Sequence, residues 1–447
     1  MSQYYTLTEV SNCLGVSKTI IRGWEVKGKL VPKEAKGEKL YSKKSLLEFD
    51  VFRQMTDSNW KKEQEIKPVR PYRSIELFAG AGGLALGLEK AGFEVALLNE
   101  VDKQAGETLK VNRPNWNVAV GDIAKLNFSH FKGNIDVLSG GFPCQAFSYA
   151  GNKQGFGDTR GTLFFEFARA IEEVQPRIFL GENVRGLLNH DKGRTLETIK
   201  KRIKDIGYTL VTPKVLKAIY FKVPQKRERL FLVGIRNDIF KKLKRSIKSD
   251  SVFHWPSPYE RVLTLKDALK AGELYLTDVP KSQGQKYPQR KKEILRKVPQ
   301  GGYWKDLSES VQKEYMQKSY FLGGGKTGMA RRLSWLEPSL TLTCSPAQKQ
   351  TERCHPEDTR PLTVREYARI QTFPDDWLFS GSVSSQYKQI GNAVPMNLAF
   401  SVGTSLIALL NDIEAIHPRN NIYELPQWSK QPEQMAFLWE RPAQYQA

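Results

Sequence analysis

The chain has 447 residues, 40% of them hydrophobic and 11% aromatic, which suits two or three folded domains and excludes wholesale disorder. Sixty-nine Lys and Arg against 48 Asp and Glu give a net charge of +21, which favours a polyanionic partner such as nucleic acid; solubility alone is the plainer explanation. No apolar run reaches about 18 residues and the N-terminus does not resemble a signal peptide, so we expect no membrane span. Four cysteines cannot form a disulfide framework, which indicates a cytoplasmic protein.

Residues 1–56 predict a small helical domain. A short helix over 8–14 is followed by a Gly-containing turn, in which Ser17 can cap a second helix over 18–29. Three residues give this second helix an apolar face: Ile20, Ile21 and Trp24. Two helices joined by such a turn have the layout of a helix-turn-helix.

Two further elements complete this domain. Residues 37–42 are typical of a wing and residues 43–49 of a third helix. Residues 4–50 together resemble the DNA-binding domain of the MerR and excisionase type, and a helical module that docks another protein is the alternative. The next stretch, 57–73, is rich in Lys, Glu and Pro, which predicts a linker.

From residue 74 onward, short apolar strands alternate with helical stretches. Strands are expected over 74–78, 95–100, 135–140 and 177–181, and a further apolar run covers 230–233. This alternation predicts an α/β fold with a mostly parallel, doubly wound sheet. The pattern is lost over 236–362, which is rich in Pro, Gly, Lys and Arg, and a helical pattern returns from residue 365.

A glycine-rich turn directly follows the first strand and precedes a helix. Three glycines allow a tight turn and close approach of a ligand: Gly80, Gly82 and Gly83. Glu100, at the end of the next strand, can accept both hydroxyls of a ribose, and Asp122 can accept from an adenine amino group. The turn lacks the dinucleotide spacing and the phosphate-binding lysine. An adenosine ligand without a required pyrophosphate, such as S-adenosylmethionine, fits this set.

Other chemically useful side chains stand at strand ends. Cys144 comes just after the strand 135–140, where ligands bind in open α/β sheets, although a lone cysteine is usually a small buried hydrophobe. Glu182 follows the strand 177–181. Arg227 and Arg229 precede an apolar run and, taken alone, are typical of a surface ion-pair cluster.

Taken together and in this order, these pieces resemble the DNA (cytosine-5)-methyltransferases of prokaryotic restriction–modification systems. Seven stretches between about residues 74 and 405 carry the resemblance: 78–83, 142–148, 160–164, 182–184, 225–231, 365–374 and 389–395. The resemblance implies the Rossmann-like fold of S-adenosylmethionine-dependent methyltransferases. It also implies duplex DNA as substrate, with the target cytosine flipped out of the helix.

The resemblance assigns roles to individual residues. Cys144 would attack carbon 6 of cytosine, Glu182 would hydrogen-bond or protonate nitrogen 3, Arg229 would bind the carbonyl oxygen, and Arg227 would hold the loop or backbone. Gln145 and Ser148 are candidates to fill the gap in the duplex or grip a phosphate. Five further cofactor contacts are expected, with the first stacking on adenine: Phe78, Ile123, Pro143, Leu163 and Asn392.

The same resemblance divides the chain into regions. The catalytic domain would comprise 74–235 and 363–413, the target-recognition region 236–362, and a C-terminal extension 414–447. Three residues of the recognition region lack the spacing of a zinc site, so no metal is expected: Cys344, Cys354 and His355. A monomer is expected in catalysis, with the enzyme's own promoter and a cognate endonuclease as further partners.

Two other functions stay open on the sequence. A transfer-RNA cytosine methyltransferase would share the fold, but the N-terminal domain and the long variable region argue against it. The second alternative is not an enzyme: it is a transcription regulator that has a methyltransferase-like fold.

Overall fold

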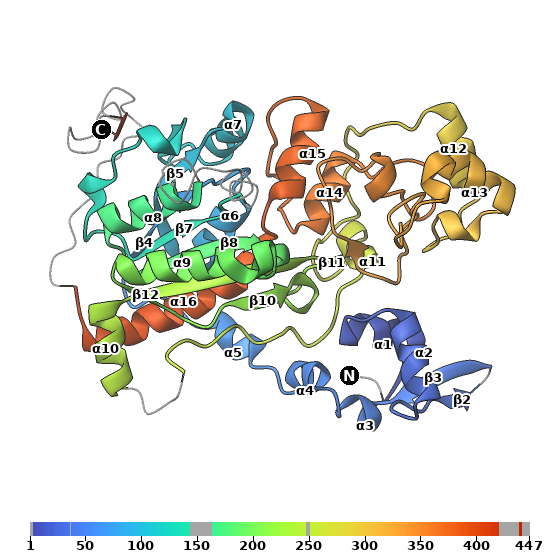
Figure 1. Ribbon diagram of the computed structural model, residues 1–447, viewed down its shortest axis with the longest axis horizontal. Coiled ribbons are helices and arrows are strands. Elements are labelled where there is room, and N and C mark those ends of the chain that lie inside the picture. Colours follow the sequence, from blue (N-terminus) through green and yellow to red (C-terminus); the bar gives the residue numbers. More distant parts are fainter. Residues whose placement is uncertain (1–2, 36, 144–162, 247–250, 420–437, 440–447) are drawn as a thin grey trace.

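A computed structural model describes residues 3–35, 37–143, 163–246, 251–419 and 438–439. Figure 1 shows three parts: an N-terminal domain, a central sheet flanked by helices, and a region rich in loops on the far side of α14 and α15. We call the central part the sheet domain. Within the stretch 236–362, which we expect to contain the target-recognition region, residues 287–354 form a hydrophobic core of their own, and from here on we call these residues the recognition region.

The sheet domain is built on one large twisted sheet. Its parallel strands are β4 (Tyr72–Leu77), β5 (Phe93–Glu100), β6 (Val118–Val120), β7 (Val137–Gly140) and β8 (Ile178–Val184). Two antiparallel strands follow β8, namely β12 (Glu228–Arg236) and then β10 (Lys214–Lys217), and β9 (Tyr208–Leu210) also pairs with β12. The order β6-β5-β4-β7-β8-β12-β10 places the first strand in the middle. This is the predicted doubly wound sheet.

Helices cover both faces of the sheet because its strands bury side chains on both sides. One face packs against α6 (Gly83–Ala91), α10 (Asn237–Ser246) and α16 (Met396–Ile416), and the other against α8 (Leu163–Val174) and α9 (Arg194–Asp205). Along β12, Leu230 and Leu232 point to one core while Phe231 and Val233 point to the other. Each such side chain contributes about 1.5–3 kcal/mol when fully buried.

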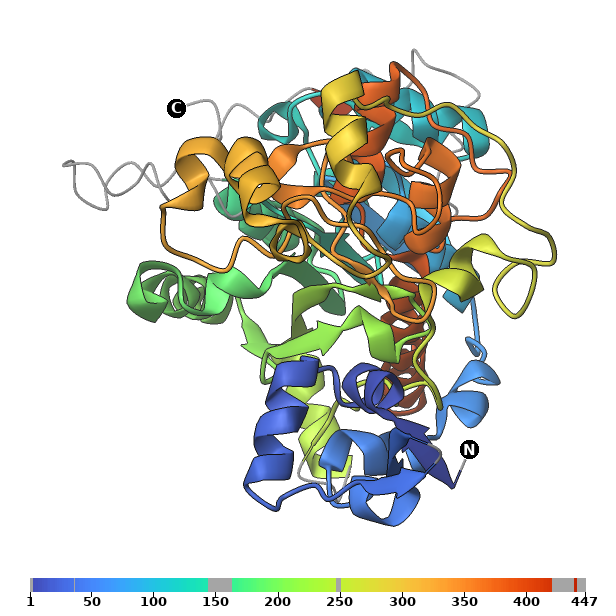
Figure 2. The same cartoon turned by 90° about the vertical axis from the view of Figure 1, so that its right-hand side faces the viewer.

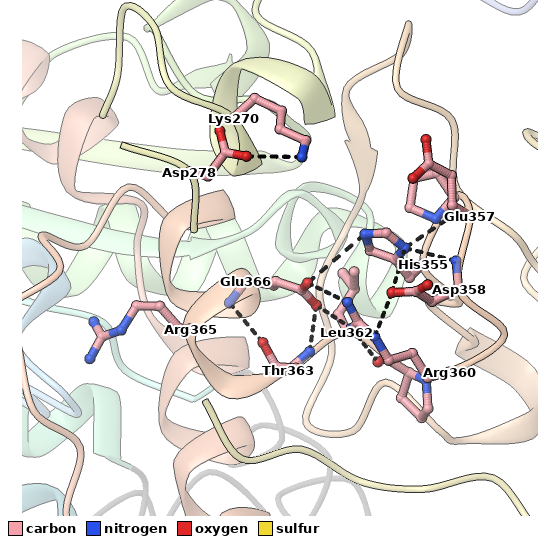
Figure 3. A network of polar contacts seen from close by, with 12 residues as sticks. Lys270, Asp278, His355, Glu357, Asp358, Arg360, Leu362, Thr363, Arg365 and Glu366 are labelled. Atoms are coloured by element: carbon pink, nitrogen blue, oxygen red, sulfur yellow. Dashed lines mark hydrogen bonds and ion pairs between the residues drawn. The ribbon is translucent and has the colours of Figure 1, made fainter. Parts of the chain in front are cut away.

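The chain returns to the sheet domain through three helices, α14 (Val364–Ile370), α15 (Val383–Asn392) and α16. Among the described residues, the stretch Val383–Ile416 is long and apolar enough to cross a membrane, but 78% of its most apolar window is buried inside the fold. A polar network marks the entry to α14, where Glu366 accepts hydrogen bonds of 2.8 Å from both Nη atoms of Arg360 and 2.7 Å from the Thr363 N–H (Figure 3). The returning helices are therefore core elements.

The stretch between β12 and α14 divides into two parts. Its first part packs on the sheet domain, since Ile239 of α10 and Leu263 belong to the core around α16. Its second part contains α12 (Gln289–Arg296) and α13 (Glu309–Met316). The basic cluster at 241–245 lies on α10, at the far end of the sheet domain from α12 and α13 (Figure 1). That cluster is therefore separated from the recognition region.

The N-terminal domain has the predicted helix-turn-helix. Its elements are β1 (Tyr4–Thr6), α1 (Leu7–Leu14), α2 (Lys18–Val26), β2 (Lys33–Ala35), β3 (Glu38–Ser42), α3 (Lys43–Leu46) and α4 (Asp50–Thr56). The Ser17 hydroxyl accepts from the Ile20 N–H and caps α2 as expected, but α2 ends before Gly28, which has φ +67°. Ile20 is 45% exposed, so the expected apolar face of α2 is narrower than the sequence suggests.

The stretch 57–73 is packed against the sheet domain. It contains α5 (Trp60–Gln64), and Trp60 is buried with its ring 5.4 Å from that of Tyr259. Met55 and Trp60 both belong to the core that contains α16. A deletion that removes residues 1–60 would therefore cut into the core of the sheet domain.

Candidate active site

The glycine-rich turn between β4 and α6 is shaped for close approach. Gly80 (φ +54°) donates its N–H to Glu100 Oε2 over 2.7 Å, and Gly82 (φ +84°) precedes the first turn of α6. A Cβ on Gly83 would stand only 2.3 Å from the carbonyl oxygen of Val394. A side chain would therefore collide with the returning segment, while the space beside Gly80 is open.

Two acidic residues stand beside this turn. Glu100 ends β5 and is 8% exposed; its Oε1 accepts the Asp102 N–H over 2.8 Å, so each oxygen keeps lone-pair capacity for a ligand hydroxyl. Asp122 is exposed, and its Oδ1 accepts the Ala124 N–H over 2.9 Å. Both positions fit an adenosine ligand that reaches across the carboxyl ends of β5 and β6.

The C-terminal extension reaches the same edge of the sheet, which the sequence did not indicate. The Leu438 carbonyl accepts the Asn127 N–H over 2.7 Å, and the Leu438 side chain is fully buried. A Cβ on Gly121 would stand 2.5 Å from the Trp439 ring, so the indole lies directly against the backbone next to Asp122. No signal in the sequence indicates that Trp439 lies beside Asp122; only the tertiary structure shows it.

Apolar side chains gather beside these carboxylates. Phe78, Ile123 and Leu163 belong to one core cluster, although Phe78 and Leu163 are only partly buried. Phe78 has φ +59°, an uncommon conformation for a non-glycine residue. Asn392 ends α15, and the next residue, Ala393, would lie 3.2 Å from a Cβ on Gly83. The backbone beside Asn392 therefore lies next to the turn, while the Asn392 side chain accepts from Cys344 Sγ over 3.4 Å.

A carboxylate–guanidinium pair lies at the ends of β8 and β12. These strands are antiparallel, with Arg229 opposite Val184, and Arg229 Nε lies 2.7 Å from Glu182 Oε1. Burial raises the pKa of the Glu182 carboxyl above its ordinary value, although the positive charges of Arg229 and Arg227 oppose this change. Glu182 can therefore hold a proton more readily than an exposed carboxyl.

The chain before Cys144 passes next to Glu182. A Cβ on Gly141 would lie 2.9 Å from Glu182 Oε2. The Asn183 amide donates to the Phe142 carbonyl over 2.7 Å and so ties this loop to β8. Pro143, an expected cofactor contact, is exposed at the end of the described loop. Three of our assignments lie outside the described residues: Cys144, Gln145 and Ser148.

Arg227 is almost fully buried and holds backbone. Its Nη1 donates to the Leu342 carbonyl over 3.2 Å, and its Nη2 donates to the carbonyls of Gly391 and Asn392 over 2.9 and 3.4 Å. These bonds join the residue just before β12 to Leu342 of the recognition region and to the end of α15. Arg227 thus fixes the backbone near Leu342 and Asn392 relative to the start of β12.

One ionisable residue of the site escaped the sequence argument. Glu76 lies in the middle of β4, is 4% exposed, and its Oε2 has no hydrogen-bond partner among the described residues. Burial raises its pKa well above the ordinary value, and the charges of Glu100 and Glu182 add to this. The charge state of Glu76 is therefore coupled to those of Glu100 and Glu182.

The described residues contain no group of three or more His, Cys, Asp or Glu side chains that could hold a metal ion. They do hold an acid with a raised pKa beside a guanidinium, and a second carboxylate, Glu100, beside the glycine-rich turn. This arrangement can bind an adenosine ligand and protonate a ring nitrogen of a second substrate. A thiol on the adjoining loop would complete a site for covalent catalysis.

Comparison with known proteins agrees with this site. Residues 72–408 match the family of C-5 cytosine-specific DNA methylases, and residues 5–68 match the MerR HTH family of regulatory proteins. The Type II methyltransferase M.Eco47II of Escherichia coli is 61% identical over 416 residues, covering 92% of this chain and 97% of its own. M.PspPI of a Psychrobacter species is 58% identical over 410 residues, covering 91% and 97%.

A solved structure shares the fold. It is a putative DNA modification methyltransferase encoded within an E. coli prophage, and it is 28% identical to this chain. The two superpose with a TM-score of 0.54 over 76% of this chain and 99% of the other.

Proposed function

The chain belongs to the C-5 cytosine-specific DNA methylases, and on that premise we propose which of its residues carry out the reaction. It methylates carbon 5 of cytosine in DNA, as a modification enzyme of the Type II restriction–modification kind. We assign Cys144 as the nucleophile, Glu182 as the acid at nitrogen 3 and Arg229 as the ligand of the cytosine carbonyl. Arg227 is a positioning residue, because its hydrogen bonds go to backbone.

Carbon 5 of cytosine needs activation before it can accept a methyl group. The Cys144 thiolate forms a bond to carbon 6, and Glu182 stabilises the electrons that move toward nitrogen 3. The electron pair released at carbon 5 forms the new bond to the methyl group, whose bond to the donor sulfur breaks. Water then takes the proton from carbon 5, and the bond between Sγ and carbon 6 breaks to release the product and regenerate the thiolate.

S-adenosylmethionine supplies the methyl group in this family, and the residues at the ends of β4, β5 and β6 fit it. Glu100 is held by two N–H groups with lone pairs to spare for ribose hydroxyls. The open space beside Gly80 leaves room for the ligand. We assign the adenine to the apolar side chains of Phe78, Ile123 and Leu163, with Asp122 at its amino group.

The observation that supports these roles is the buried Glu182 carboxyl, 2.7 Å from Arg229, on the strand next to the loop of Cys144. The test is covalent trapping on duplex DNA with 5-fluorocytosine at the target, because fluorine at carbon 5 cannot leave as a proton. Wild-type enzyme with cofactor should form a stable adduct, and Cys144→Ser should form none and lose methyl transfer. Cys354→Ala, which changes a buried thiol in the recognition region, is the matched control. Substantial turnover by Cys144→Ser would refute the assignment.

DNA rather than RNA is the substrate that family membership indicates. Methyl transfer to duplex DNA and to transfer RNA should be measured side by side with the same preparation. Transfer to DNA alone is expected. Sequencing the methylated cytosines of a plasmid that carries the gene would then identify the target site, and a cognate endonuclease should cut the unmethylated plasmid at that site.

The match of residues 5–68 to MerR regulators supports a second role, in transcription. We propose that the N-terminal domain binds the promoter of its own gene. A reporter fused to that promoter should be repressed by the Cys144→Ser protein as strongly as by wild type, because repression needs no methyl transfer. Unchanged reporter expression with both proteins would contradict this role.

A further inference from the structure

A cavity of about 440 Å³ lies between the N-terminal domain and the sheet domain. Its N-terminal wall is the turn before α2, residues Gly15 to Ser17. Its opposite wall includes Lys217 of β10 together with Lys226 and Arg229. Arg229 also pairs with Glu182, so the cavity adjoins the base-binding part of the active site. Figure 2 shows the N-terminal domain, in dark blue, beneath the green strands of this edge.

Specific contacts hold the turn of the helix-turn-helix at this edge. Lys18 Nζ lies 2.8 Å from Glu337 Oε1, and the Asn12 amide donates to the Leu336 carbonyl over 2.9 Å. A Cβ on Gly15, which has φ +61°, would stand 2.7 Å from the hydroxyl of Tyr220. Cys13 packs against the cores of both domains. The first turn of α2, where a helix-turn-helix reads DNA, thus faces the active-site edge.

The cavity lining is strongly basic. Four cations contribute: Lys217, Lys226, Arg227 and Arg229. Lys226 and Arg229 are paired, at 3.4 Å with Glu337 and at 2.7 Å with Glu182, and Glu228, the one acid among the described lining residues, is paired with Arg185 over 2.9 Å. Arg227 is 1% exposed, and its Nε has no hydrogen-bond partner among the described residues. An unpartnered buried donor and an excess of cations are the properties of a site for an anion.

The start of α2 adds to this preference. α2 has nine residues and begins at Lys18, directly after Ser17 in the cavity wall. The N-terminal end of a helix carries a partial positive charge and exposed N–H groups, which favour phosphate oxygens. The anion that comes closest to Arg229 during the reaction is the backbone of the flipped nucleotide, because flipping rotates that nucleotide about its own phosphates.

We propose that this cavity binds a backbone phosphate of the substrate duplex, so that the MerR-like domain forms part of the surface that holds DNA for methylation. The inference rests on the proposed function, since it takes duplex DNA as the substrate of the Glu182–Arg229 site. The MerR-like domain would then help to bind the DNA substrate for methylation, in addition to any binding to a promoter. The competing hypothesis is that the docked N-terminal domain blocks access of DNA to the active site.

The test compares two lysines of the same strand. Lys217 lines the cavity, whereas Lys214 is exposed on β10 outside it. Binding of each Lys→Gln variant to a short duplex with one target site is measured across a range of salt concentrations. Lys217→Gln should bind several-fold more weakly, and the slope of log K against log salt should fall by about 1, the value for one lost phosphate contact. Lys214→Gln should match wild type.

Further readouts separate the possible outcomes. A phosphate contact carries no sequence information, so Lys217→Gln should weaken target and non-target duplexes equally. Equal affinities and slopes for the two variants would overturn the inference, and they would leave the function intact if wild type still methylates DNA. Lys18→Glu, which repels Glu337 and loosens the docked domain, should weaken binding to the target duplex. Tighter binding by Lys18→Glu would show instead that the domain blocks the cleft.

Discussion

The sheet domain and the recognition region satisfy their buried backbone groups by different means. In the sheet domain, seven hydrogen-bonded strands in one path take up most of these groups, and site residues such as Glu100 and Glu182 stand near strand ends. In the recognition region, buried arginine side chains do part of this work. Arg332 is 4% exposed and donates from Nε to the Val298 carbonyl and from Nη2 to the Leu295 carbonyl, each over 2.8 Å.

This difference teaches where each region tolerates change. A sheet spreads its hydrogen bonds over many residues, so a single side chain at a strand end is free to serve chemistry. In the recognition region one side chain supports several loops, so its loss should be structural first. Variants at strand ends of the sheet domain should therefore lose catalytic rate, whereas variants of buried arginines in the recognition region should lose folding stability.

The largest effect is expected at Glu182. Glu182→Ala should lower the rate of methyl transfer by about 10²- to 10⁴-fold, the usual contribution of a general acid, with the fold retained. Because the pKa of Glu182 is raised and its protonated form is the active one, the wild-type rate should fall as pH rises through that pKa. Glu182→Gln should lack this alkaline limb. Rates measured from pH 5 to 9 with saturating DNA test both points, and a parallel fall in the Gln variant would count against Glu182.

Arg332 should show the opposite behaviour. Arg332→Met leaves the carbonyls of Val298 and His355 without the Arg332 donor, at a cost of about 1–3 kcal/mol for each buried group, while the Leu295 carbonyl keeps the Val298 N–H. Hydrogen exchange should then lose protection over residues 287–354 while the sheet stays protected. Arg296→Met, the same substitution at an exposed position, should leave exchange unchanged. Equal loss of protection in the sheet would contradict the separation of the two regions.

Glu76 tests whether a buried acid of the sheet is costly. Its folded pKa is raised, so the folded state keeps a proton that the unfolded state loses above about pH 4.3, and wild-type stability should fall as pH rises above that point. The slope can reach about 1.4 kcal/mol per pH unit. Glu76→Gln carries no such proton, so its urea midpoint should exceed that of wild type at pH 8 and match it near pH 4. Identical midpoints at pH 8 would mean that Glu76 is ionised in the folded protein.

The smallest effect is expected at the surface of the recognition region. Arg290 joins α12 to α13 through two 2.6 Å contacts with Glu314, but its side chain is 65% exposed. Exposed ion pairs contribute little because water screens them and their side chains lose entropy. Arg290→Ala should shift the melting temperature by no more than about 2 °C. A larger shift would mean that surface pairs, and not buried arginines alone, hold this region together.

The sheet was predictable because its local signals agree with its tertiary structure. The four strands expected from the sequence are short apolar runs that end at or just before a glycine or a carboxylate, so Gly80, Glu100 and Glu182 could be placed at one edge before their contacts were known. The helix-turn-helix was also predictable, because Ser17 marks the start of its second helix. The sequence alone could not say that the turn faces Lys217, because that contact joins residues about two hundred positions apart.

Three features had no local signal. Glu76 lies inside an apolar strand pattern, where alternation gives no hint of a buried acid with an unpartnered oxygen. The recognition region has little periodicity, because its loops depend on arginine–carbonyl bonds rather than on ladders. Trp439 follows a long stretch without apparent chemistry, and only its contact with Gly121 connects it to the site.

The packing of α16 has a consequence for biosynthesis. This helix supplies much of the core on one face of the sheet, yet it spans residues 396–416, and its main partner, α6, ends at residue 91. While the ribosome makes the residues between them, that apolar face has no cover. Nascent chains should therefore depend on chaperones until translation is nearly complete, and messages truncated before codon 396 should yield aggregates rather than partly active enzyme.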